Sequence, residues 1–420
     1  MTCAVVCIGT ELTRGELVNT NASWLAAFLT DIGFEVVEDV VVDDHRDRIV
    51  ATLERLGKTV RVLVCTGGLG PTTDDITTEC VARTLGVKLV RDDTSLESIR
   101  RRIEKYGRAM SASNAKQADF PEGAEVLPNP LGTAPGFGVK LGGSQAFFMP
   151  GVPKEMKRMF EDQVIPKIRT LASRDSHQIR LRTYGLPESL VGERLAGVED
   201  AFPGVTIGYR AHFPEIEVKV LARAATNPLA VELCERATIE VRGRLSDVVY
   251  GEADDTFAAV VGRTLRRKGL TLAIAESCTG GLIGHMLTRE PGASDYLLVD
   301  AVTYANSAKA RLLGVDEDVI RGHGAVSVEV AAAMAEGVKR VSGAELALAL
   351  TGVAGPTGGT AAHPVGTVFI AVTGPPGLRW GDAPQSPGTM VKERHFVGDR
   401  HQIQTLAAYA GLELIRRACV

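Results

Sequence analysis

Strand-like and helix-like patterns alternate from the start of the chain, and this alternation constrains the fold more than any other feature of the sequence. Apolar runs at residues 3–9, 34–42 and 60–66 are separated by helix-like segments at residues 21–33 and 46–57. Apolar strands joined by helices form a parallel sheet that is covered on both faces. We therefore predict a βαβαβ domain, whose ligands bind at the carboxyl ends of its strands.

The rest of the chain divides into two further domains, as its length of 420 residues allows. A polar stretch at residues 172–177 is interpreted as a linker after a first α/β domain over residues 1–171. The strand–helix–strand–strand–helix–strand order that follows predicts a small α+β domain over residues 172–251. Strands and helices alternate again over residues 252–420, with an expected exposed loop at residues 375–388. The predicted fold class is α/β, with two α/β sheet domains joined by a small α+β domain.

Composition limits the classes of partner that we expect. The formal net charge of -4 and the pI near 6.1 provide no general attraction to nucleic acid or to anionic membranes. The seven cysteines are scattered without a CxxC pair, which argues against a disulfide framework and against a zinc knuckle. No apolar run is long enough to cross a membrane. We therefore expect a cytoplasmic protein that binds small molecules rather than nucleic acid or membranes.

The segment IAESCTGGLI at residues 274–283 places two candidate nucleophiles where a strand ends and a helix begins. Either the hydroxyl of Ser277 or the thiol of Cys278 could attack a substrate there. Free N–H groups at a helix N-terminus can bind an oxyanion, so we expect Thr279, Gly280 and Gly281 to contact the substrate. The alternative is that Ser277 or Thr279 only caps the helix.

Two other loops are expected at the same edge of this sheet. The first carries Tyr304 and Lys309: a lysine kept neutral by burial can accept the proton of a serine, and a tyrosine hydroxyl can relay it. Taken alone, Tyr304 could equally be a core residue and Lys309 part of a solvated helix face. The second loop, at residues 350–360, is rich in glycine and could line a phosphate or a ribose, or be an ordinary turn.

The motifs AESCTGGL, VTYANSAK, LTGVAGPTGGT and FVGDR together resemble the C-terminal domain of the competence/damage-inducible CinA family over residues 254–420. In that family the domain is a nicotinamide mononucleotide amidohydrolase that needs no cofactor. The resemblance implies that Ser277, rather than Cys278, is the nucleophile and that Tyr304 and Lys309 act beside it. The residues that it implies around the nucleotide are Thr351, Gly352, Ala354 and Gly355.

The sequence departs from this family pattern at one point near its end. Family members commonly carry an arginine shortly after the GDR segment, whereas this chain has Gln404 at that position. If that arginine helps to hold the phosphate of the substrate, Arg400 could serve instead in this chain.

In the first domain, the segment TGGLGPTTDD at residues 66–75 follows a buried strand and precedes a helix. Its glycines expose backbone N–H groups that can bind a phosphate, and Asp74 and Asp75 offer the hard oxygen ligands that divalent metals prefer. Asp75 could instead cap the following helix. Together these features favour a metal and diphosphate site.

This segment, with IGTELTRGELVNTN, NPLGTAPGF and MPGVPKEM, resembles the N-terminal domain of the same family, which shares its fold with molybdopterin-binding proteins. The resemblance implies metal-dependent hydrolysis of ADP-ribose at its pyrophosphate, with Mg²⁺ or a similar divalent metal held by Asp74 and Asp75. The residues carried over for the ADP-ribose phosphates are Gly67, Gly68, Gly70, Thr72, Glu11, Asn21 and Glu155. The alternative for this domain is a pterin binder without catalysis.

The family places a KH-like domain between these two, in agreement with the predicted βαββαβ order. No two glycines between Ala172 and Tyr250 are three residues apart, so the GxxG clamp of nucleic-acid-binding KH domains is missing. We interpret this domain as a spacer or as a dimerisation element, and family likeness implies a homodimer. The non-enzyme alternative is a competence or DNA-damage accessory protein that binds DNA or a partner protein.

Overall fold

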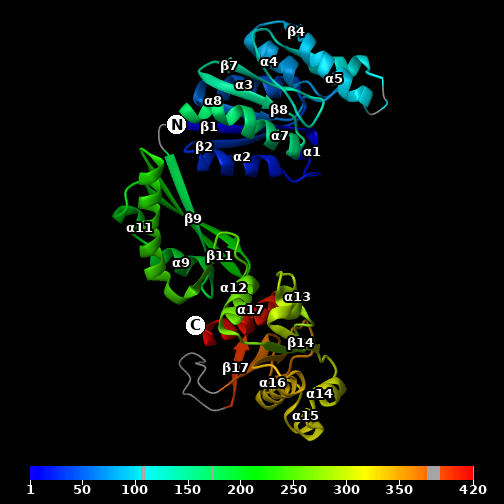
Figure 1. Cartoon of the computed structure of the whole chain (residues 1–420), viewed down its shortest axis with the longest axis vertical. Coiled ribbons are helices and arrows are strands. Elements are labelled where there is room, and N and C mark those ends of the chain that lie inside the picture. Colours follow the sequence, from blue (N-terminus) through cyan, green and yellow to red (C-terminus); the bar gives the residue numbers. More distant parts are fainter. Residues whose placement is uncertain (106, 108, 172–174, 376–387, 420) are drawn as a thin grey trace. The chain divides into compact units, whose positions relative to one another are not determined.

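The computed structural model describes residues 1–105, 107, 109–171, 175–375 and 388–419 (Figure 1). The chain forms two compact units, between which the middle domain is divided. One comprises Met1–Gln178, Glu199–Thr206 and Val220–Thr238, and the other comprises Ile179–Val198, Ile207–Lys219 and Ile239–Val420. The loop predicted at residues 375–388 lies outside the described residues except at its two ends.

The first domain contains a six-stranded sheet with the strand order β2-β1-β3-β8-β7-β6. Its strands are β1 (Thr2–Ile8), β2 (Glu35–Val42), β3 (Val62–Thr66), β6 (Glu125–Leu127), β7 (Gly136–Leu141) and β8 (Ser144–Met149). The parallel pairing predicted for the first three strands is confirmed, and β8 joins them in parallel, whereas β7 pairs antiparallel with both β8 and β6. Only Gly142 and Gly143 join β7 to β8, and so short a connection returns the chain antiparallel.

Helices cover both faces of this sheet, as Figure 1 shows. The covering helices are α2 (Thr20–Asp31), α3 (Arg46–Thr59), α4 (Thr77–Leu85) and α7 (Pro153–Met159). Alternate residues of β1 face opposite ways, so Cys3 and Val5 pack with α2 and α7, whereas Ala4 and Val6 pack with α3 and α4. The smaller elements are α1 (Thr10–Thr13), β4 (Leu89–Arg91), α5 (Asp93–Lys105), α6 (Ala112–Ala115), β5 (Asp119–Pro121) and α8 (Ile165–Ile168).

The middle domain has the predicted strand and helix order. Its elements are β9 (Asp175–Tyr184), α9 (Glu188–Leu195), α10 (Val198–Ala201), β10 (Val205–His212), β11 (Glu215–Ala224), α11 (Asn227–Leu245) and β12 (Val249–Glu252), with the sheet order β10-β11-β9-β12. The linker predicted at residues 172–177 is partly wrong, because β9 already begins at Asp175. Ser176 is fixed there by donating its hydroxyl to the carbonyls of Thr30 and Asp31, at 2.6 and 2.9 Å.

The third domain contains a five-stranded sheet with the order β14-β13-β15-β16-β17. Its strands are β13 (Leu272–Glu276), β14 (Leu297–Val302), β15 (Leu346–Gly352), β16 (Thr367–Thr373) and β17 (Thr389–His395). β14, β13 and β15 run parallel, so their carboxyl ends meet at one edge, whereas β16 and β17 are antiparallel additions. The site predicted from the loops after β13, β14 and β15 is therefore built at this edge.

Apolar side chains divide between the two faces of this sheet as well. The helices are α12 (Phe257–Lys268), α13 (Leu282–Thr288), α14 (Asn306–Leu313), α15 (Glu317–His323), α16 (Val328–Ser342) and α17 (Arg400–Ala418). Leu272 and Ile274 pack with α12, α13 and α17, while Ala273 and Ala275 pack with α14, α15 and α16. The small residues on the second face let α16 approach the strands closely.

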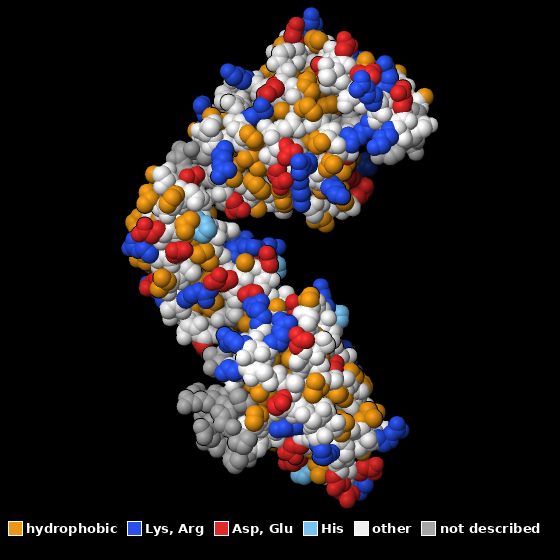
Figure 2. Space-filling view, viewed as in Figure 1, with side chains coloured by type: hydrophobic (Ala, Val, Ile, Leu, Met, Phe, Trp, Pro, Cys, Tyr) orange, Lys and Arg blue, Asp and Glu red, His pale blue; other side chains and the backbone are white. Residues whose placement is uncertain are grey.

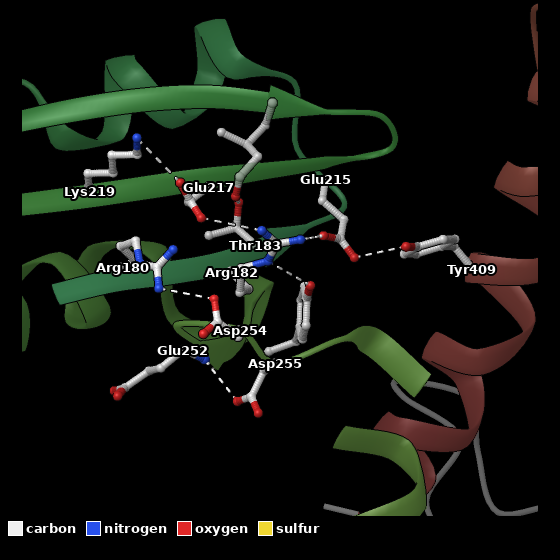
Figure 3. Close-up of polar contacts among 12 residues, drawn as sticks. Arg180, Arg182, Thr183, Glu215, Glu217, Lys219, Glu252, Asp254, Asp255 and Tyr409 are labelled. Atoms are coloured by element: carbon white, nitrogen blue, oxygen red, sulfur yellow. Dashed lines mark hydrogen bonds and ion pairs between the residues drawn. The ribbon is translucent and has the colours of Figure 1, made fainter. Parts of the chain in front are cut away.

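A polar cluster joins the middle sheet to α17 within the second unit (Figure 3). Arg182 on β9 forms ion pairs with Glu215 and Glu217 on β11, and its Nε donates to the hydroxyl of Tyr250 at 3.2 Å. Tyr409 on α17 donates its hydroxyl to the other oxygen of Glu215, at 2.9 Å. Both glutamates are only 3% exposed, so these partners satisfy charges that burial would otherwise destabilise.

The surface carries charges of both signs. Figure 2 shows Lys and Arg side chains interspersed with Asp and Glu side chains over the visible face. Among the residues that the structure describes, no helix is both long enough and apolar enough to span a bilayer.

Candidate active site

Ser277 lies in the tight loop between β13 and α13. Its N–H donates to the carbonyl of Leu350 on the neighbouring strand, at 3.1 Å, which extends the sheet pairing to the loop. Gly280 and Gly281 then both adopt positive φ, at 66° and 95°, so the chain turns sharply into α13. Ser277 is 9% exposed, and its position is fixed by backbone contacts on both sides.

Lys309, on the first turns of α14, reaches the hydroxyl of Ser277. Its Nζ lies 3.1 Å from Ser277 Oγ, 2.8 Å from the carbonyl oxygen of Thr303 and 3.4 Å from that of Tyr304. The residue is 1% exposed and, among the described residues, has no ion-pair partner. Burial therefore lowers the pKa of the Lys309 ammonium. In the neutral amine the two carbonyls can accept N–H groups, and a lone pair is left for the serine proton.

Cys278, the competing nucleophile, lacks an environment that would ionise it. Burial raises the pKa of its thiol to about 12. A nucleophilic cysteine needs a lowered pKa, so the local chemistry favours Ser277.

Tyr304 occupies a different place from the one predicted for a proton relay. The residue is 60% exposed, and its hydroxyl accepts a hydrogen bond from Nη2 of Arg400 at 2.8 Å. Nη1 of Arg400 donates to the carbonyl of Gly355 at 2.7 Å. Only the backbone carbonyl of Tyr304 contacts Lys309. The three predicted loops and the start of α17 thus converge, with Ser277 and Lys309 buried and Tyr304 and Arg400 at the rim.

The backbone N–H groups predicted to bind an oxyanion are largely occupied. The N–H of Gly280 donates to the carbonyl of Ser277 at 3.2 Å, and the N–H of Gly281 donates to Oε2 of Glu276 at 3.0 Å. In the structure, the N–H groups of these two glycines are therefore engaged within the loop and the strand end before it. Thr279 is 4% exposed, and its hydroxyl has no partner among the described residues.

The four residues predicted to surround the nucleotide lie at the end of β15 and in the loop after it, and they are mostly buried. Thr351 is buried and donates its hydroxyl to the carbonyl of Ala325 at 2.6 Å. Gly352 lies so close to β16 that a Cβ there would be 2.6 Å from the carbonyl oxygen of Thr367. Ala354 is also buried, which leaves Gly355, through its carbonyl, as the member of this group that contacts Arg400.

Gln404 and Glu276 also contribute to this site. The sequence identified Gln404 only as the replacement of a family arginine, and it did not identify Glu276. Gln404, where the family pattern has arginine, donates its side-chain amide to the carbonyl of Cys278 at 2.8 Å. Glu276 is fully buried at the end of β13. A charged residue that ends an apolar strand directly before the nucleophile was the available sequence signal for Glu276.

The first domain has its own cavity at the carboxyl ends of its parallel strands, with a volume of about 410 Å³. Most of the residues predicted for ADP-ribose line it, namely Glu11, Asn21, Gly67, Gly68, Gly70, Asp74, Asp75 and Glu155. Thr72 does not; its N–H donates to Oδ2 of Asp75 at 2.8 Å. Two further lining residues, Asp44 and Gln117, come from segments in which the sequence showed no motif.

The charged side chains that line this cavity are all acidic. Its lining has five carboxylates, from Glu11, Asp44, Asp74, Asp75 and Glu155, and no Lys, Arg or His. No three acidic, His or Cys side chains among the described residues converge closely enough to form a metal cage by themselves. Mg²⁺ is typically held by one or two carboxylates together with phosphate oxygens of the substrate, and this dispersed set of oxygens fits that mode.

Comparison with known proteins adds three matches that together span most of the chain. Residues 4–170 match a family model described as "Probable molybdopterin binding domain", residues 178–251 match "Damage-inducible protein CinA KH domain", and residues 254–419 match "CinA C-terminal domain". The matches follow the α/β, KH-like and α/β domains that the structure shows.

Two curated relatives are similar over nearly their whole length. A CinA-like protein from Desulfosudis oleivorans is 45% identical over 382 residues, which cover 90% of this chain and 92% of the relative. A CinA-like protein from Geobacter sulfurreducens is 42% identical over 419 residues, or 99% of each chain.

Two solved structures are similar to part of the chain. The protein CinA from Thermoplasma acidophilum, titled as having unknown function, is 36% identical over 40% of this chain and 97% of its own, with a TM-score of 0.37. The competence/damage inducible protein CihA from Agrobacterium tumefaciens is 35% identical over 37% of this chain and 90% of its own, with a TM-score of 0.34.

Proposed function

The chain belongs to the CinA family, and we propose that its C-terminal domain is an amidohydrolase that converts nicotinamide mononucleotide and water to nicotinic acid mononucleotide and ammonia. The observation that carries this proposal is the contact between the Lys309 amine and the Ser277 hydroxyl, at 3.1 Å between two buried residues. A serine activated by a neutral lysine is suited to attack a carboxamide carbon.

In the first half of the reaction, Ser277 Oγ forms a bond to the carboxamide carbon while Lys309 Nζ accepts the serine proton. The lysine returns this proton to the departing nitrogen, the C–N bond breaks, and ammonia leaves. In the second half, water attacks the ester carbon while Lys309 accepts its proton; the bond from that carbon to Ser277 Oγ breaks, Lys309 returns the proton to Oγ, and nicotinic acid mononucleotide leaves. Burial favours the neutral amine that both halves require.

At the rim, Arg400 is the group that we assign to the phosphate of the nucleotide. Its guanidinium is held between the Tyr304 hydroxyl and the Gly355 carbonyl, so it is oriented before a substrate arrives. A planar guanidinium can bind a phosphate through two N–H groups at once. We assign Tyr304 to the same rim rather than to proton transfer.

The test measures ammonia release from nicotinamide mononucleotide by the Ser277→Ala variant. Cys278→Ala, a change at the adjacent residue, is the control. We expect Ser277→Ala to lose at least about 10³-fold in kcat/KM, and Cys278→Ala to stay within about threefold of the unmodified protein. Undiminished ammonia release by Ser277→Ala would refute the assignment of the nucleophile.

A second activity is proposed for the first domain because of its acidic cavity. We propose that this domain hydrolyses ADP-ribose at the pyrophosphate with a divalent metal, for which Asp74 and Asp75 are the first ligands to test. Five carboxylates without a basic residue would repel a free diphosphate, so the anion requires a cation to enter. The metal would neutralise the diphosphate and polarise its phosphorus for attack by water.

Chelation separates this activity from the pterin-binding alternative. Removing divalent metal with EDTA should abolish ADP-ribose cleavage, and adding Mg²⁺ should restore it. If cleavage is absent with Mg²⁺ and a molybdopterin compound binds instead, the domain is a pterin binder without catalysis.

We also propose that the protein acts in the cytoplasm as a homodimer in pyridine nucleotide salvage, with no nucleic-acid or membrane partner. Sedimentation of the full chain measures the oligomeric state. A salt-dependent shift of labelled DNA at physiological ionic strength would support the accessory-protein alternative instead.

A further inference from the structure

Behind the nucleophile loop, two carboxyl groups from neighbouring strands meet at the start of α13. Glu276 ends β13, and Asp300 lies on the adjacent parallel strand β14, where it pairs with Ile274 in the register. The carboxyl oxygens of Glu276 accept the N–H groups of Gly281, at 3.0 Å, and Gly284, at 2.9 Å. Glu276 therefore connects the strand before the nucleophile to the helix after it.

Gly284 makes room for the second carboxyl group. A Cβ at this position would lie 1.9 Å from Oδ2 of Asp300, so any larger residue would displace that carboxyl group. The other oxygen, Oδ1 of Asp300, is buried and has no partner among the described residues. The fold thus holds Asp300 against α13, and no Lys, Arg or His of the described residues forms an ion pair with it.

Both carboxyl groups lie at Gly284, whose N–H donates to Oε1 of Glu276 at 2.9 Å and whose Cα faces Oδ2 of Asp300. Two ionised carboxyl groups so placed repel each other, which favours a proton on one of them. Burial, followed by the nearby charge of Glu276 and hydrogen bonding to it, raises the pKa of Asp300 to about 7. A protonated Asp300 can donate its O–H to Glu276, and Glu276 keeps its remaining acceptor capacity for the two backbone N–H groups.

We propose that Asp300 is a positioning residue for the amidohydrolase reaction: its proton anchors Glu276, and Glu276 fixes the Ser277–Gly281 loop against α13. This inference rests on the proposed function of the C-terminal domain and extends it, because neither carboxyl group touches the substrate or the reacting atoms. Loss of the proton from Asp300 loosens the loop and turns the Ser277 hydroxyl away from Lys309.

The other charged groups near the pair do not replace its proton. On α14, Lys309 lies on the Ser277 side of the loop and is held by the carbonyls of Thr303 and Tyr304. On α13 and on the turn before β14, His285 and Asp295 are exposed to solvent. The thiol of Cys278 stays neutral because burial raises its pKa to about 12. The pair therefore responds to pH mainly through Asp300.

The experiment compares the full-length protein with Asp300→Asn, whose amide has the shape of the protonated acid and donates a hydrogen bond at every pH. The kcat/KM for nicotinamide mononucleotide is measured from about pH 6 to about pH 9. Two pH units above its pKa only about 1% of Asp300 keeps its proton, so the ratio of Asp300→Asn to unmodified protein should rise by about tenfold or more. Parallel pH profiles of the two proteins would overturn the proposal.

The second variant, Glu276→Gln, changes the other carboxyl group of the pair. Its amide offers one acceptor oxygen instead of two, so one of the N–H groups of Gly281 and Gly284 loses its partner. We expect about a tenfold lower kcat/KM at all pH values, together with loss of the fall in activity above about pH 7. A Glu276→Gln enzyme that retains this alkaline fall would contradict the proposal.

Thermal unfolding distinguishes failure of this inference from failure of the proposed substrate. Because the pKa of Asp300 is higher in the folded state than in the unfolded state, its contribution to stability is full at low pH and is lost between about pH 4 and pH 7. The Tm of Asp300→Asn relative to the unmodified protein should therefore rise across this window. If nicotinamide mononucleotide is not hydrolysed but this rise is seen, the pair is supported and the proposed substrate is wrong; a constant Tm difference overturns the pair.

Discussion

Replacing Lys309 by methionine tests most directly whether the buried amine accepts the proton of Ser277. Methionine has a similar length and no charge, so the buried position can hold it without a large change in volume. Its thioether cannot accept a proton from the hydroxyl 3.1 Å from the former amine. A positioned general base contributes about 10²–10⁴-fold, and an unactivated serine is a poor nucleophile, so we expect a loss of about 10³-fold or more in kcat/KM.

The stability of the same variant should change little, which separates a catalytic role from a structural one. Removing the amine leaves the buried carbonyl of Thr303 without this donor, which costs about 1–3 kcal/mol for an unsatisfied buried group. The variant also no longer has to desolvate an amine at a site that is 1% exposed, a term of similar size and opposite sign. We therefore expect the Tm of Lys309→Met to remain within a few degrees of that of the unmodified protein.

The proposed role of Lys309 predicts how kcat/KM and stability change with pH. Burial lowers the pKa of Lys309, so in Asp300→Asn, which lacks the fall expected above about pH 7, kcat/KM should rise with pH through a value below the ordinary 10.5 of lysine. Between these two pKa values the unfolded lysine holds a proton that the folded one lacks, so stability also rises with pH. Lys309→Met lacks the rise of kcat/KM and the rise of stability. Its Tm relative to that of the unmodified protein should therefore fall as the pH rises.

The assay is ammonia release across pH, with thermal unfolding measured in the same buffers. Lys268→Met is a matched control, because Lys268 is exposed at the end of α12 and its replacement should leave both readouts unchanged. If Lys309→Met kept more than about a tenth of the activity, the amine could not be the base. If it lost activity only together with a large fall in Tm, the role of Lys309 would be structural.

Four further variants test other parts of the structure. Tyr304→Phe should keep kcat/KM within about threefold, because its hydroxyl contacts Arg400; a loss of about 10²-fold would support the relay instead. Gly284→Ala should lower the free energy of unfolding by about 1–3 kcal/mol in urea, because its methyl group would overlap the Asp300 carboxyl group. Asp74→Asn should weaken Mg²⁺-dependent ADP-ribose cleavage by about tenfold or more and leave ammonia release unchanged. Tyr409→Phe should lower the stability of the second unit by about 1–3 kcal/mol, since the buried Glu215 loses a donor, and unchanged urea unfolding would contradict this.

The placement of Ser277 and Lys309 could be predicted because it depends on backbone topology. The loops after β13 and β14 both leave the carboxyl ends of parallel strands, and these ends lie at one edge whatever the side chains do. The apolar runs and the β–α alternation fixed this topology. The choice of Lys309 as the partner of Ser277 came from the family resemblance, because by itself Lys309 could equally have belonged to a solvated helix face.

Side-chain direction could not be predicted in the same way. The hydroxyl of Tyr304 turns to Arg400, which is 96 residues away and reaches the site from a different helix. The N–H of Gly281 is occupied because Glu276, five residues earlier, bends its carboxyl group back to it. Both outcomes depend on rotamers and on distant neighbours, which periodicity and motif spacing do not encode.

Helix α17 connects the rim of the site with the middle sheet. Near its N-terminus Arg400 holds the rim of the site and Gln404 holds the loop that follows Ser277, while further along Tyr409 binds the Glu215 carboxyl group of the middle sheet. A helix is stiff over this length, so the residues at its start can be placed only as well as the whole helix is packed. The ring of Tyr409 packs against Tyr184 on β9, with centroids 5.3 Å apart, which adds an apolar contact to the polar one. Glu215 and Tyr184 of the middle domain therefore pack against the helix from which two of the site residues extend.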